Sequence, residues 1–481
     1  MGLSTERMYE LSWRRDRSAD GRFLLGVTTT GIYCRPSCPA KRPRRENVRF
    51  FLSAAAARAA GLRACRRCRP DEAAAPGADD VTRIGELVAR VRRDPADFPD
   101  TAALAAAAGV GATRLHELFR HAFHAGPAEL LRRARVTAAA GRLLAGDERV
   151  LDVGFAAGFD SASAFHAAFR KVARLSPGEL REAPRRGGFR LALPPGFRAD
   201  LVWAFLGRDP ESPTERTAPG RLARALDLPE GPATLHVELA AGAAECRIEA
   251  AAPLAPASWQ AIHRVALALL GLHVDPRPFE RRMTQQGGAA ARLVGGRRGL
   301  SIPQSPTPWE GLTWAILGQQ VNLAFAYRLR RRLIELAGRP APGGLVAHPA
   351  PAAVAALDPA DLLGRQFSRR KAEYLVEAAR AVAAGELPLD ALAAGPAPAL
   401  ERALLARRGV GPWTARYVML RAAGLVDCVP VGDAGLTAAL ARFFSLPERP
   451  GPEETEALMR PFAPYRSFAT NHLWTSLGGP A

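Results

Sequence analysis

The chain has 481 residues, of which 48% are hydrophobic and 7% aromatic, a composition that is typical of a folded protein and excludes a wholly disordered one. A chain of this length exceeds one ordinary core, so we expect about three or four domains. The formal charge of +19 at pH 7 predicts a polyanionic partner such as nucleic acid, although an arginine- and alanine-rich composition can also follow from genome base composition.

The N-terminal segment argues against export. Residues 1–20 carry charged side chains and no apolar core segment, so no signal peptide is expected. No stretch approaches the about 20 apolar residues that a bilayer span needs. We therefore expect a cytoplasmic protein without a membrane partner.

The cysteines give the first specific pattern. Of six, four lie in one 35-residue window with the spacing C-x3-C, then 26 residues, then C-x2-C. In a reducing cytoplasm two close thiol pairs are typical of a tetrahedral zinc site rather than of disulfide bonds. On spacing alone, such a site could simply stabilise a small fold. We expect one Zn²⁺ with the ligands Cys34, Cys38, Cys65 and Cys68.

The residues around these cysteines carry a resemblance. The chain reads Thr-Thr-Thr-Gly-Ile-Tyr-Cys-Arg-Pro-Ser-Cys-Pro-Ala from Thr28 and Ala-Cys-Arg-Arg-Cys-Arg-Pro-Asp from Ala64. Residues 1–75 resemble the N-terminal zinc domain of the Ada family of adaptive-response regulators. The resemblance implies that Cys34 takes a methyl group irreversibly from a methylated DNA phosphate. Zinc keeps such a sulfur deprotonated and nucleophilic, and its methylation removes one negative charge, which favours DNA binding.

Two polar segments flank the second cysteine pair. The basic run Lys-Arg-Pro-Arg-Arg at residues 41–45 contains Arg44 and Arg45, which are candidate contacts to the DNA backbone. An exposed charge run can also be only a solvated surface. The sequence DEAAAPGADD at residues 71–80 is small, acidic and interrupted by Pro76 and Gly77, so it predicts a linker.

The next segment has helical periodicity and two glycine turns. The first turn is Gly109-Val-Gly111, and a long helix from Pro127 to Leu144 leads to a second unit in which Asp160 is expected to cap a helix. We expect inward-facing Leu115, Leu118, Phe119, Phe165 and Phe169, and outward-facing Arg114, His116 and Arg120.

Two helix-turn-helix units joined by a long helix are similar to the AraC family of regulators. The resemblance rests on the residues around Gly154-Phe155, Gly158-Phe159 and Ser176-Pro177. It implies a DNA-binding domain at residues 80–182. Such helix pairs also occur as plain scaffold. The second unit would present to the major groove Ser161, Ser163, His166 and Arg170.

One expected companion of these domains is missing. Ada proteins usually continue into a methylguanine methyltransferase domain with a reactive Pro-Cys-His-Arg, and this chain has no such motif. Cys246 and Cys428 instead have the character of small buried residues. We therefore expect no methylguanine activity.

Residues 189–285 predict an α+β domain without catalytic residues. A short linker is expected at Pro184–Gly188, followed by alternating strands near residues 234–239 and 244–250 and an amphipathic helix. His236, His263 and His273 are not spaced as metal ligands. The block resembles the N-terminal domain of the AlkA family of 3-methyladenine glycosylases.

The C-terminal part, residues 286–481, is helical and carries the strongest motif. Gly409-Val-Gly411-Pro-Trp-Thr lies 22 residues ahead of Asp433, and a tight Gly-x-Gly turn between helices can present backbone N–H groups to an anion. The constellation resembles the helix-hairpin-helix glycosylases, and the AlkA family in particular, which implies an all-α glycosylase domain. Gly409 and Gly411 would then hold the DNA backbone.

The resemblance assigns roles to a small set of residues. Asp433 would stabilise the positive charge that develops on the sugar, although an aspartate after Gly432 is by itself a common helix N-cap. Trp413, Tyr417 and Trp474 would form an aromatic pocket that favours cationic alkylated bases. Buried aromatic residues can also be only core.

Two observations limit the reaction. Trp413 occupies the place of the Schiff-base lysine of strand-cutting glycosylases, and Lys371 is the only lysine in the C-terminal half, so monofunctional hydrolysis is predicted. No cysteine cluster follows Asp433, so no iron–sulfur cluster is expected.

The chain departs from its relatives at Gly432, where they have a second acidic residue, and at Gln320, where they have an apolar wedge.

We therefore expect a multidomain α and α+β protein with a zinc domain, a double helix-turn-helix, an α+β domain and an all-α glycosylase domain. Its function would couple excision of alkylated bases of the 3-methyladenine type to methylation sensing and transcriptional regulation. The alternative is a methylation-switched transcription activator whose glycosylase half is degraded. The expected partners are alkylated and promoter double-stranded DNA, with RNA polymerase in addition, and the protein is expected to be a monomer.

Overall fold

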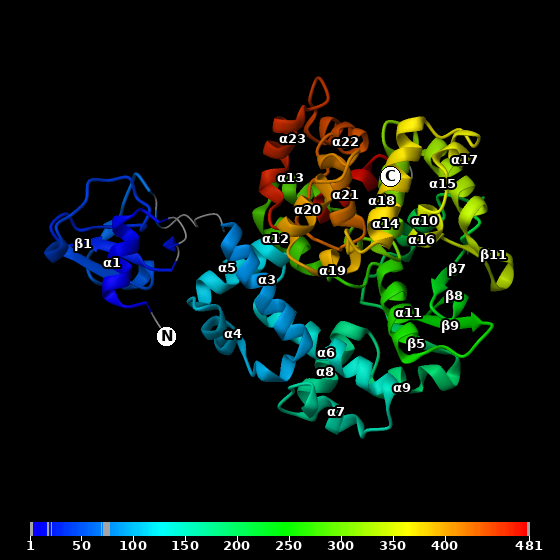
Figure 1. Cartoon of the computed structure of the whole chain (residues 1–481), viewed down its shortest axis with the longest axis horizontal. Coiled ribbons are helices and arrows are strands. Elements are labelled where there is room, and N and C mark those ends of the chain that lie inside the picture. The colour runs from blue at the N-terminus through cyan, green and yellow to red at the C-terminus, as the bar shows by residue number, and fades with distance from the viewer. Residues whose placement is uncertain (1–2, 17–18, 21, 69, 71–76, 479–481) are drawn as a thin grey trace. The chain divides into compact units, whose positions relative to one another are not determined.

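The computed structural model describes residues 3–16, 19–20, 22–68, 70 and 77–478. The chain forms two compact units, Met1–Arg135 and Val136–Ala481. Their boundary falls inside the long helix α6 (Pro127–Ala145), and Figure 1 shows the course of the chain. The four domain boundaries expected from the sequence stay a prediction. None of the described helices combines the length and the apolar character needed to cross a membrane.

The N-terminal part of the first unit is built on a four-stranded sheet with the strand order β3-β1-β2-β4. Strands β2 and β4 run parallel, so that the segments carrying Cys34 and Cys65 leave the sheet side by side. Leu24, Tyr33 and Leu62 form a small core beneath it. The elements are α1 (Thr5–Trp13), β1 (Leu24–Val27), β2 (Ile32–Cys34), η2 (Arg45–Asn47), β3 (Val48–Phe51), α2 (Ala54–Ala59) and β4 (Arg63–Ala64).

A helical bundle completes the first unit. Its elements are α3 (Ala78–Arg93), η3 (Pro95–Asp97), α4 (Thr101–Ala108) and α5 (Ala112–Phe123). The predicted turn is confirmed, because Gly109 ends α4 with a left-handed φ of 65° and Gly111 caps α5. Leu115, Leu118 and Phe119 are buried, as expected.

Two predictions for this bundle need correction. Arg114 faces inward, because it forms ion pairs with Asp80 at 2.8 Å and with Glu117 at 3.2 Å. The predicted linker at residues 71–80 is too long, because α3 already begins at Ala78. Residues 71–76 lie outside the described part of the chain.

The second helix-turn-helix opens the second unit. Its helices are α7 (Val150–Ala156), α8 (Ala162–Ala173) and α9 (Pro177–Arg186). Phe165 and Phe169 are buried one turn apart, as predicted, with ring centroids 5.6 Å apart. The N-cap of α8 is Ser161 and not Asp160, because the Ser161 hydroxyl accepts a hydrogen bond from the Ala164 N–H at 3.2 Å.

The predicted linker at Pro184–Gly188 is wrong. Helix α9 runs through Pro184 to Arg186, and β5 (Gly188–Ala192) starts after a single left-handed residue, Gly187. Gly188 must be small, because a Cβ there would lie 2.2 Å from the carbonyl oxygen of Cys246 on the paired strand. The chain therefore passes from the helix-turn-helix into the next sheet without a spacer.

That sheet has five antiparallel strands in the order β5-β9-β8-β7-β6. It shares one hydrophobic core with the second helix-turn-helix, since Phe165 and Phe169 belong to the same buried cluster as Leu235 and Ile262. The elements are α10 (Ala199–Leu206), β6 (Glu215–Ala218), β7 (Arg221–Leu228), β8 (Gly231–Ala240), β9 (Ala243–Ala250) and α11 (Pro256–Leu269).

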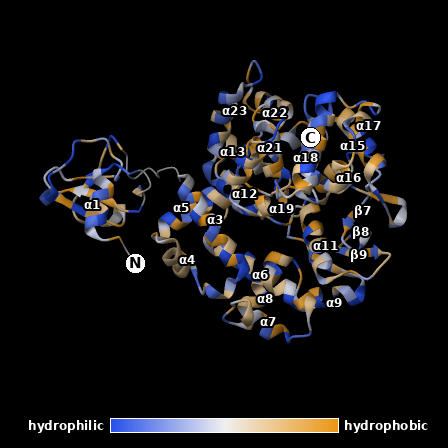
Figure 2. Cartoon of the chain, in the orientation of Figure 1, coloured by the Kyte–Doolittle hydropathy of each residue, from blue (hydrophilic) through white to orange (hydrophobic). Residues whose placement is uncertain are grey.

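The remaining chain is a helical domain with one large core. Helix α14 packs against α18 and α21, and Leu312, Leu375 and Val418 are buried at their contacts. The helices of this domain carry hydrophilic and hydrophobic residues side by side (Figure 2), as expected for helices that each bury one face. The hairpin β10 (Arg339–Ala341) and β11 (Leu345–Ala347) lies against β7 and β8 of the sheet.

The helices of this domain are α12 (Arg277–Gln286), α13 (Gly288–Val294), α14 (Pro308–Gly318), α15 (Leu323–Ala337), α16 (Pro351–Ala355), α17 (Pro359–Leu363), α18 (Arg369–Ala383), α19 (Leu389–Ala394), α20 (Ala397–Leu405), α21 (Pro412–Arg421), α22 (Ala434–Phe444), α23 (Pro452–Met459) and α24 (Arg466–Ser476); its short 3-10 turns are η4 (Pro342–Gly344) and η5 (Arg460–Phe462).

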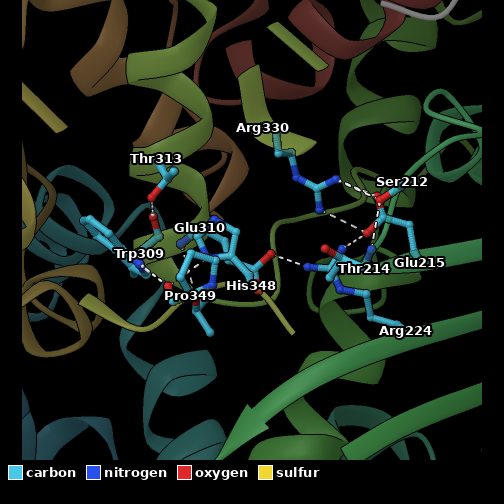
Figure 3. A network of polar contacts seen from close by, with 11 residues as sticks. Ser212, Thr214, Glu215, Arg224, Trp309, Glu310, Thr313, Arg330, His348 and Pro349 are labelled. Atoms are coloured by element: carbon cyan, nitrogen blue, oxygen red, sulfur yellow. Dashed lines mark hydrogen bonds and ion pairs between the residues drawn. The ribbon is translucent and has the colours of Figure 1, made fainter. Parts of the chain in front are cut away.

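A buried ion network ties the sheet to α14 and α15 (Figure 3). Arg224 on β7 pairs with both Glu215 on β6 and Glu310 on α14. Arg330 on α15 reaches Glu215 at 2.9 Å and the Ser212 hydroxyl at 3.0 Å. Burial alone would raise the pKa of Glu215, but Arg330 and Arg224 outweigh it and lower that pKa to about 2.

This network gives a stability prediction. Replacing Glu215 by Gln leaves buried guanidinium charge uncompensated, so we expect the free energy of unfolding at neutral pH to fall by about 3–5 kcal/mol. Because the pKa of Glu215 is depressed in the folded state, its contribution is complete above the unfolded value of 4.5 and is lost as the pH falls toward about 2. The difference in the free energy of unfolding between the wild type and Glu215→Gln should therefore become smaller as the pH falls from 4.5 toward about 2.

Urea unfolding followed by tryptophan fluorescence measures this difference in the free energy of unfolding. The matched control is Glu238→Gln, which removes an exposed carboxylate that pairs with Arg221 at 2.7 Å on the same sheet. The control should change stability by less than about 0.5 kcal/mol. Equal losses in the two variants would contradict the assigned role of the network.

Candidate active site and metal centre

Asp433 lies at the N-terminus of α22, after a turn that begins at Pro430. Its Oδ1 atom accepts a hydrogen bond from the Leu436 N–H at 2.7 Å, so the residue caps the helix. Gly432 before it has a φ of 85°, a left-handed conformation that an acidic residue at this position would have to adopt at a cost. The turn fixes where the carboxylate points.

Two indole rings hold the same carboxylate. Trp413 on α21 donates its Nε1–H to Oδ2 at 2.9 Å, and Trp474 on α24 donates its Nε1–H to Oδ1 at 2.8 Å. Together with the Leu436 N–H, three donors are directed at the two oxygen atoms of Asp433. Asp433 is thus an N-cap and also the centre of a hydrogen-bonded group drawn from three helices.

The predicted aromatic residues lie together around it. The Tyr417 ring centroid is 5.5 Å from that of Trp413 and 6.2 Å from that of Trp474. The Tyr417 hydroxyl accepts a hydrogen bond from the Trp314 indole at 2.9 Å. Sequence reasoning missed Arg421, which is 3% exposed and has its guanidinium carbon 5.0 Å from the Trp474 ring centroid.

The glycine hairpin joins α20 to α21. Gly409 has a φ of 79°, and a Cβ there would lie 2.2 Å from the Tyr374 ring, so only glycine fits. Gly411 faces open space and caps α21. The Gln319 side chain, which sequence reasoning did not single out, donates to the Gly409 carbonyl at 2.8 Å and to the Thr414 hydroxyl at 2.9 Å.

Gln320 and Lys371 lie at the end of α14. Gln320 is exposed, with a left-handed φ of 54°. The Lys371 ammonium donates to the carbonyl oxygens of Ile316, Leu317 and Gln319 at 3.1, 3.0 and 2.8 Å. Burial lowers the pKa of Lys371 to about 8. Lys371 therefore closes the C-terminus of α14 and fixes the turn that carries Gln320.

The four N-terminal cysteines form a compact cluster. The sulfur atoms of Cys34, Cys38, Cys65 and Cys68 all lie within 4.8 Å of one another. Cys34 ends β2, and Cys65 follows β4, where its N–H bonds to the Tyr33 carbonyl at 3.0 Å. Cys34 is 6% exposed, and Cys68 is the more accessible of the two.

The donor set fits a divalent cation. A hydrogen bond to Cys68, then burial and repulsion by the other sulfurs, raise the pKa of Cys34 above its ordinary value, so the thiolates need a positive charge among them. Four thiolates at this spacing suit the tetrahedral coordination of one Zn²⁺. Cys246 and Cys428 lie elsewhere and are buried, and burial raises the pKa of Cys428 to about 12.

The other predicted residues have varied surroundings. The Arg44 side chain is 85% exposed and lies 3.8 Å from the Glu46 carboxylate, and Arg45 pairs with Glu6 and lies 4.8 Å from the Tyr9 ring centroid. His263 is buried, with its Nε2 atom 2.8 Å from the Ala173 carbonyl oxygen. On α8, Ser161, Ser163 and Arg170 are exposed and His166 is half-buried.

A thiolate metal site, two helix-turn-helix units and a carboxylate beside a glycine hairpin define a multidomain DNA-binding protein with a base-excision fold. Comparison with known families agrees along the chain. The metal binding domain of Ada matches residues 7–71, a helix-turn-helix domain matches residues 104–183, and the HhH-GPD superfamily of base excision DNA repair proteins matches residues 313–464.

Relatives cover the whole chain. It is 32% identical to the probable bifunctional transcriptional activator/DNA repair enzyme AlkA of Mycobacterium tuberculosis, over 99% of this chain and 97% of that protein. It is 39% identical to the bifunctional transcriptional activator/DNA repair enzyme Ada of Escherichia coli, over 24% of this chain and 32% of that protein. The chain therefore belongs to the family of bifunctional transcriptional activators and DNA repair enzymes.

A solved structure shares the fold of the C-terminal part. The 3-methyladenine DNA glycosylase from Archaeoglobus fulgidus superposes with a TM-score of 0.53 at 22% identity, over 60% of this chain and 97% of that chain. At this identity the likeness concerns the fold alone. The expected combination of zinc, helix-turn-helix, α+β and helical glycosylase folds is confirmed, as is one Zn²⁺ on the four cysteines.

Proposed function

We propose that the C-terminal half hydrolyses the N-glycosidic bond of alkylated bases, of the 3-methyladenine type, in double-stranded DNA. The observation that carries this proposal is the Asp433 carboxylate, held by the indole N–H groups of Trp413 and Trp474 beside the glycine hairpin. The family of the chain supports a repair enzyme, and the name of its mycobacterial relative supports excision by an AlkA-type site.

Asp433 acts as a fixed negative charge. As the bond between C1′ and the base nitrogen breaks, the electron pair leaves with the base and positive charge develops on the sugar. Three N–H donors keep the carboxylate in one orientation, so it stabilises that charge without reorganising. Water then bonds to C1′ and releases a proton, and the products are the free base and an abasic site.

Base extrusion would use the hairpin and the turn after α14. Gly409 and Gly411 would hold the DNA backbone through N–H groups at the start of α21, as helix N-termini do. Gln320 would enter the space left by the extruded base. Lys371 holds the turn that carries Gln320, because its ammonium group donates a hydrogen bond to the Gln319 carbonyl oxygen. Extrusion costs a few kcal/mol, and the cost is least where alkylation has weakened the base pair.

The reaction should stop at the abasic site. Lys371 is committed to three carbonyl oxygens at the end of α14, and Trp413 stands where strand-cutting relatives have their lysine. We expect the wild-type chain to release free base from alkylated DNA and to leave strands that break only after hot alkali. A covalent complex trapped by borohydride would contradict hydrolysis, and no release of base would contradict the enzyme proposal altogether.

The indole of Trp413 gives a prediction for the chemical step. Trp413→Phe keeps a ring in place but removes the N–H that holds Oδ2 of Asp433, so we expect kcat for base release to fall by about tenfold or more with KM nearly unchanged. Trp203→Phe is the control, because among the described residues its indole N–H bonds to the backbone carbonyls of Ala218 and Arg221 and to no carboxylate. An unchanged kcat in Trp413→Phe would remove the indole from the mechanism.

The N-terminal site supports a second activity, methyl acceptance from DNA phosphotriesters. The Cys34 sulfur would bond to the methyl carbon while the carbon–oxygen bond breaks, and the phosphate would regain its negative charge. Bound zinc supplies the positive charge that keeps the cysteine sulfurs ionised at neutral pH. Arg44, exposed, and Arg45, already paired with Glu6, would contact the DNA backbone.

Loss of one negative charge at Cys34 would strengthen DNA binding and switch on transcription. Residues 1–75, 80–182, 189–285 and 286–481 would be the four domains of a cytoplasmic monomer, with α8 reading promoter DNA and RNA polymerase as the further partner. The alternative, an activator with a degraded glycosylase half, predicts that Asp433 variants lose nothing. The intact hydrogen bonds around Asp433 favour a working enzyme.

A further inference from the structure

A cavity of about 120 Å³ adjoins the aromatic cluster, between the sheet and helices α14, α15 and α21. Tyr417 belongs to both, because its ring packs near Trp413 and Trp474 and also lines the cavity. One water molecule needs only about 10–15 Å³ of such space. The cavity can therefore admit part of an extruded base.

Most charged groups of the cavity wall neutralise one another. The carboxylates of Glu215 and Glu310 pair with Arg224 and Arg330 in the network of Figure 3. Asp209 lies 3.6 Å from the Arg331 guanidinium. Its Oδ2 atom is buried without a hydrogen-bond partner, but among the described residues none of these carboxylates forms an ion pair with the two remaining guanidinium groups.

These two groups belong to Arg208 and Arg421. Among the described residues neither forms an ion pair, and the Nε atom of each is buried without a hydrogen-bond partner. Both lie over the Phe205 ring, with guanidinium carbons 4.1 and 4.4 Å from its centroid. Burial, and then repulsion by Arg421, lower the pKa of Arg208 to about 10, so it stays charged at neutral pH.

Arg421 is the more constrained of the pair. Its Nη atoms donate to the Pro303 carbonyl and to Asn471 Oδ1, both at 3.0 Å. It also lies 5.0 Å from the Trp474 ring centroid. A protein cation thus already occupies a ring face that was expected to attract a cationic base, and the Asp433 carboxylate partly balances its charge.

We propose that Arg208, together with Arg421, extends excision to uncharged bases by donating a hydrogen bond to a carbonyl oxygen on the base. Cationic 3-methyladenine has no carbonyl oxygen and gains nothing from these groups, but it is a good leaving group and needs less help. Arg208 is therefore a residue that sets the lesion range of this site. This inference rests on the proposed glycosylase function.

The test compares two substrates in the full-length protein. One is duplex DNA with a single hypoxanthine, which is uncharged and carries a carbonyl oxygen; the other is DNA treated with methyl methanesulfonate, from which release of 3-methyladenine, a cationic base without a carbonyl oxygen, is followed. Arg208→Met leaves no buried group without its partner, because Arg208 has no ion pair among the described residues. We expect its kcat/KM for hypoxanthine to fall about tenfold, with release of 3-methyladenine unchanged or faster.

The control is Arg292→Met, which removes an exposed guanidinium 5.5 Å from the Phe443 ring centroid and should leave both substrates unaffected. Thermal unfolding of both variants checks that they fold. If Arg208→Met lowers both activities by the same factor, or leaves hypoxanthine release unchanged, the inference is wrong. It is also wrong if the wild type releases methylated bases but no hypoxanthine, whereas release of neither would overturn the glycosylase function itself.

Discussion

Asp433→Asn is expected to lower the rate of base release by about a hundredfold to a thousandfold. The substitution removes the negative charge that faces the sugar. It also places an amide where Trp413 and Trp474 both donate, so one indole N–H loses its acceptor. Release of 3-methyladenine from alkylated DNA, measured by chromatography under single-turnover conditions, gives the rate.

Folding should survive this change, because asparagine caps helices about as well as aspartate. The matched control is Asp358→Asn, which changes the N-cap of α17 in the same helical domain. We expect the control to excise bases at the wild-type rate and both variants to bind DNA normally. Equal activity of Asp433→Asn and wild type would reduce Asp433 to a helix cap.

Loss of the metal site should have the other large effect. Zinc bound to four thiolates contributes on the order of 10–16 kcal/mol to the folding of small domains, which exceeds what the small core of Leu24, Tyr33 and Leu62 can supply. Cys38→Ala should therefore lose bound zinc, unfold the four-stranded sheet and abolish methyl acceptance at Cys34. Metal content and native mass spectrometry measure both losses.

The loss of structure caused by Cys38→Ala should be confined to the first unit. Helices α14, α21, α22 and α24, which position Asp433, belong to the separate core of the second unit, so Cys38→Ala should retain base release. Cys246→Ala is the control, because Cys246 belongs to the core beneath the five-stranded sheet in the second unit and is not one of the four clustered cysteines. A Cys38 variant that keeps one zinc per chain would show that the fourth ligand lies elsewhere.

Much of this arrangement could be predicted because short motifs carry it. The cysteine spacing alone predicted the cluster, and the Gly109-Val-Gly111 turn predicted where α4 ends. The resemblance to the helix-hairpin-helix glycosylases, carried by Gly409, Gly411 and Asp433, indicated the hairpin and its carboxylate. Such features depend on residues close together in the chain, where local geometry leaves little choice.

The rest depends on contacts between distant segments. The indole bonds to Asp433 require α21, α22 and α24 to meet, and no pattern within one helix indicates them. Arg114 was predicted to face outward, and Asp80 on another helix draws it inward. The sequence has 66 Lys and Arg residues, and nothing in it distinguishes Arg208 and Arg421 from the others. Only the folded structure shows that both line one cavity.

Local preference also failed at two boundaries. Pro184 and the following glycines predicted a linker, but a proline can remain in a helix whose core face is buried, and Leu180 and Ala183 of α9 are buried. Asp160 and Ser161 are both good capping residues, and the hydrogen bond to Ala164 selects the second. The sequence alone does not distinguish between two adjacent residues that have equal preference for the N-cap position.

The central claim is that one chain accepts methyl groups at Cys34 and excises alkylated bases at Asp433. The most direct measurement follows both products in one reaction of full-length protein with methylated DNA: the mass of the peptide containing Cys34, and the free 3-methyladenine. Wild type should give both, Cys34→Ser only the free base, and Asp433→Asn only the methylated peptide. An unmodified Cys34, or no free base, in the wild-type reaction would contradict the account.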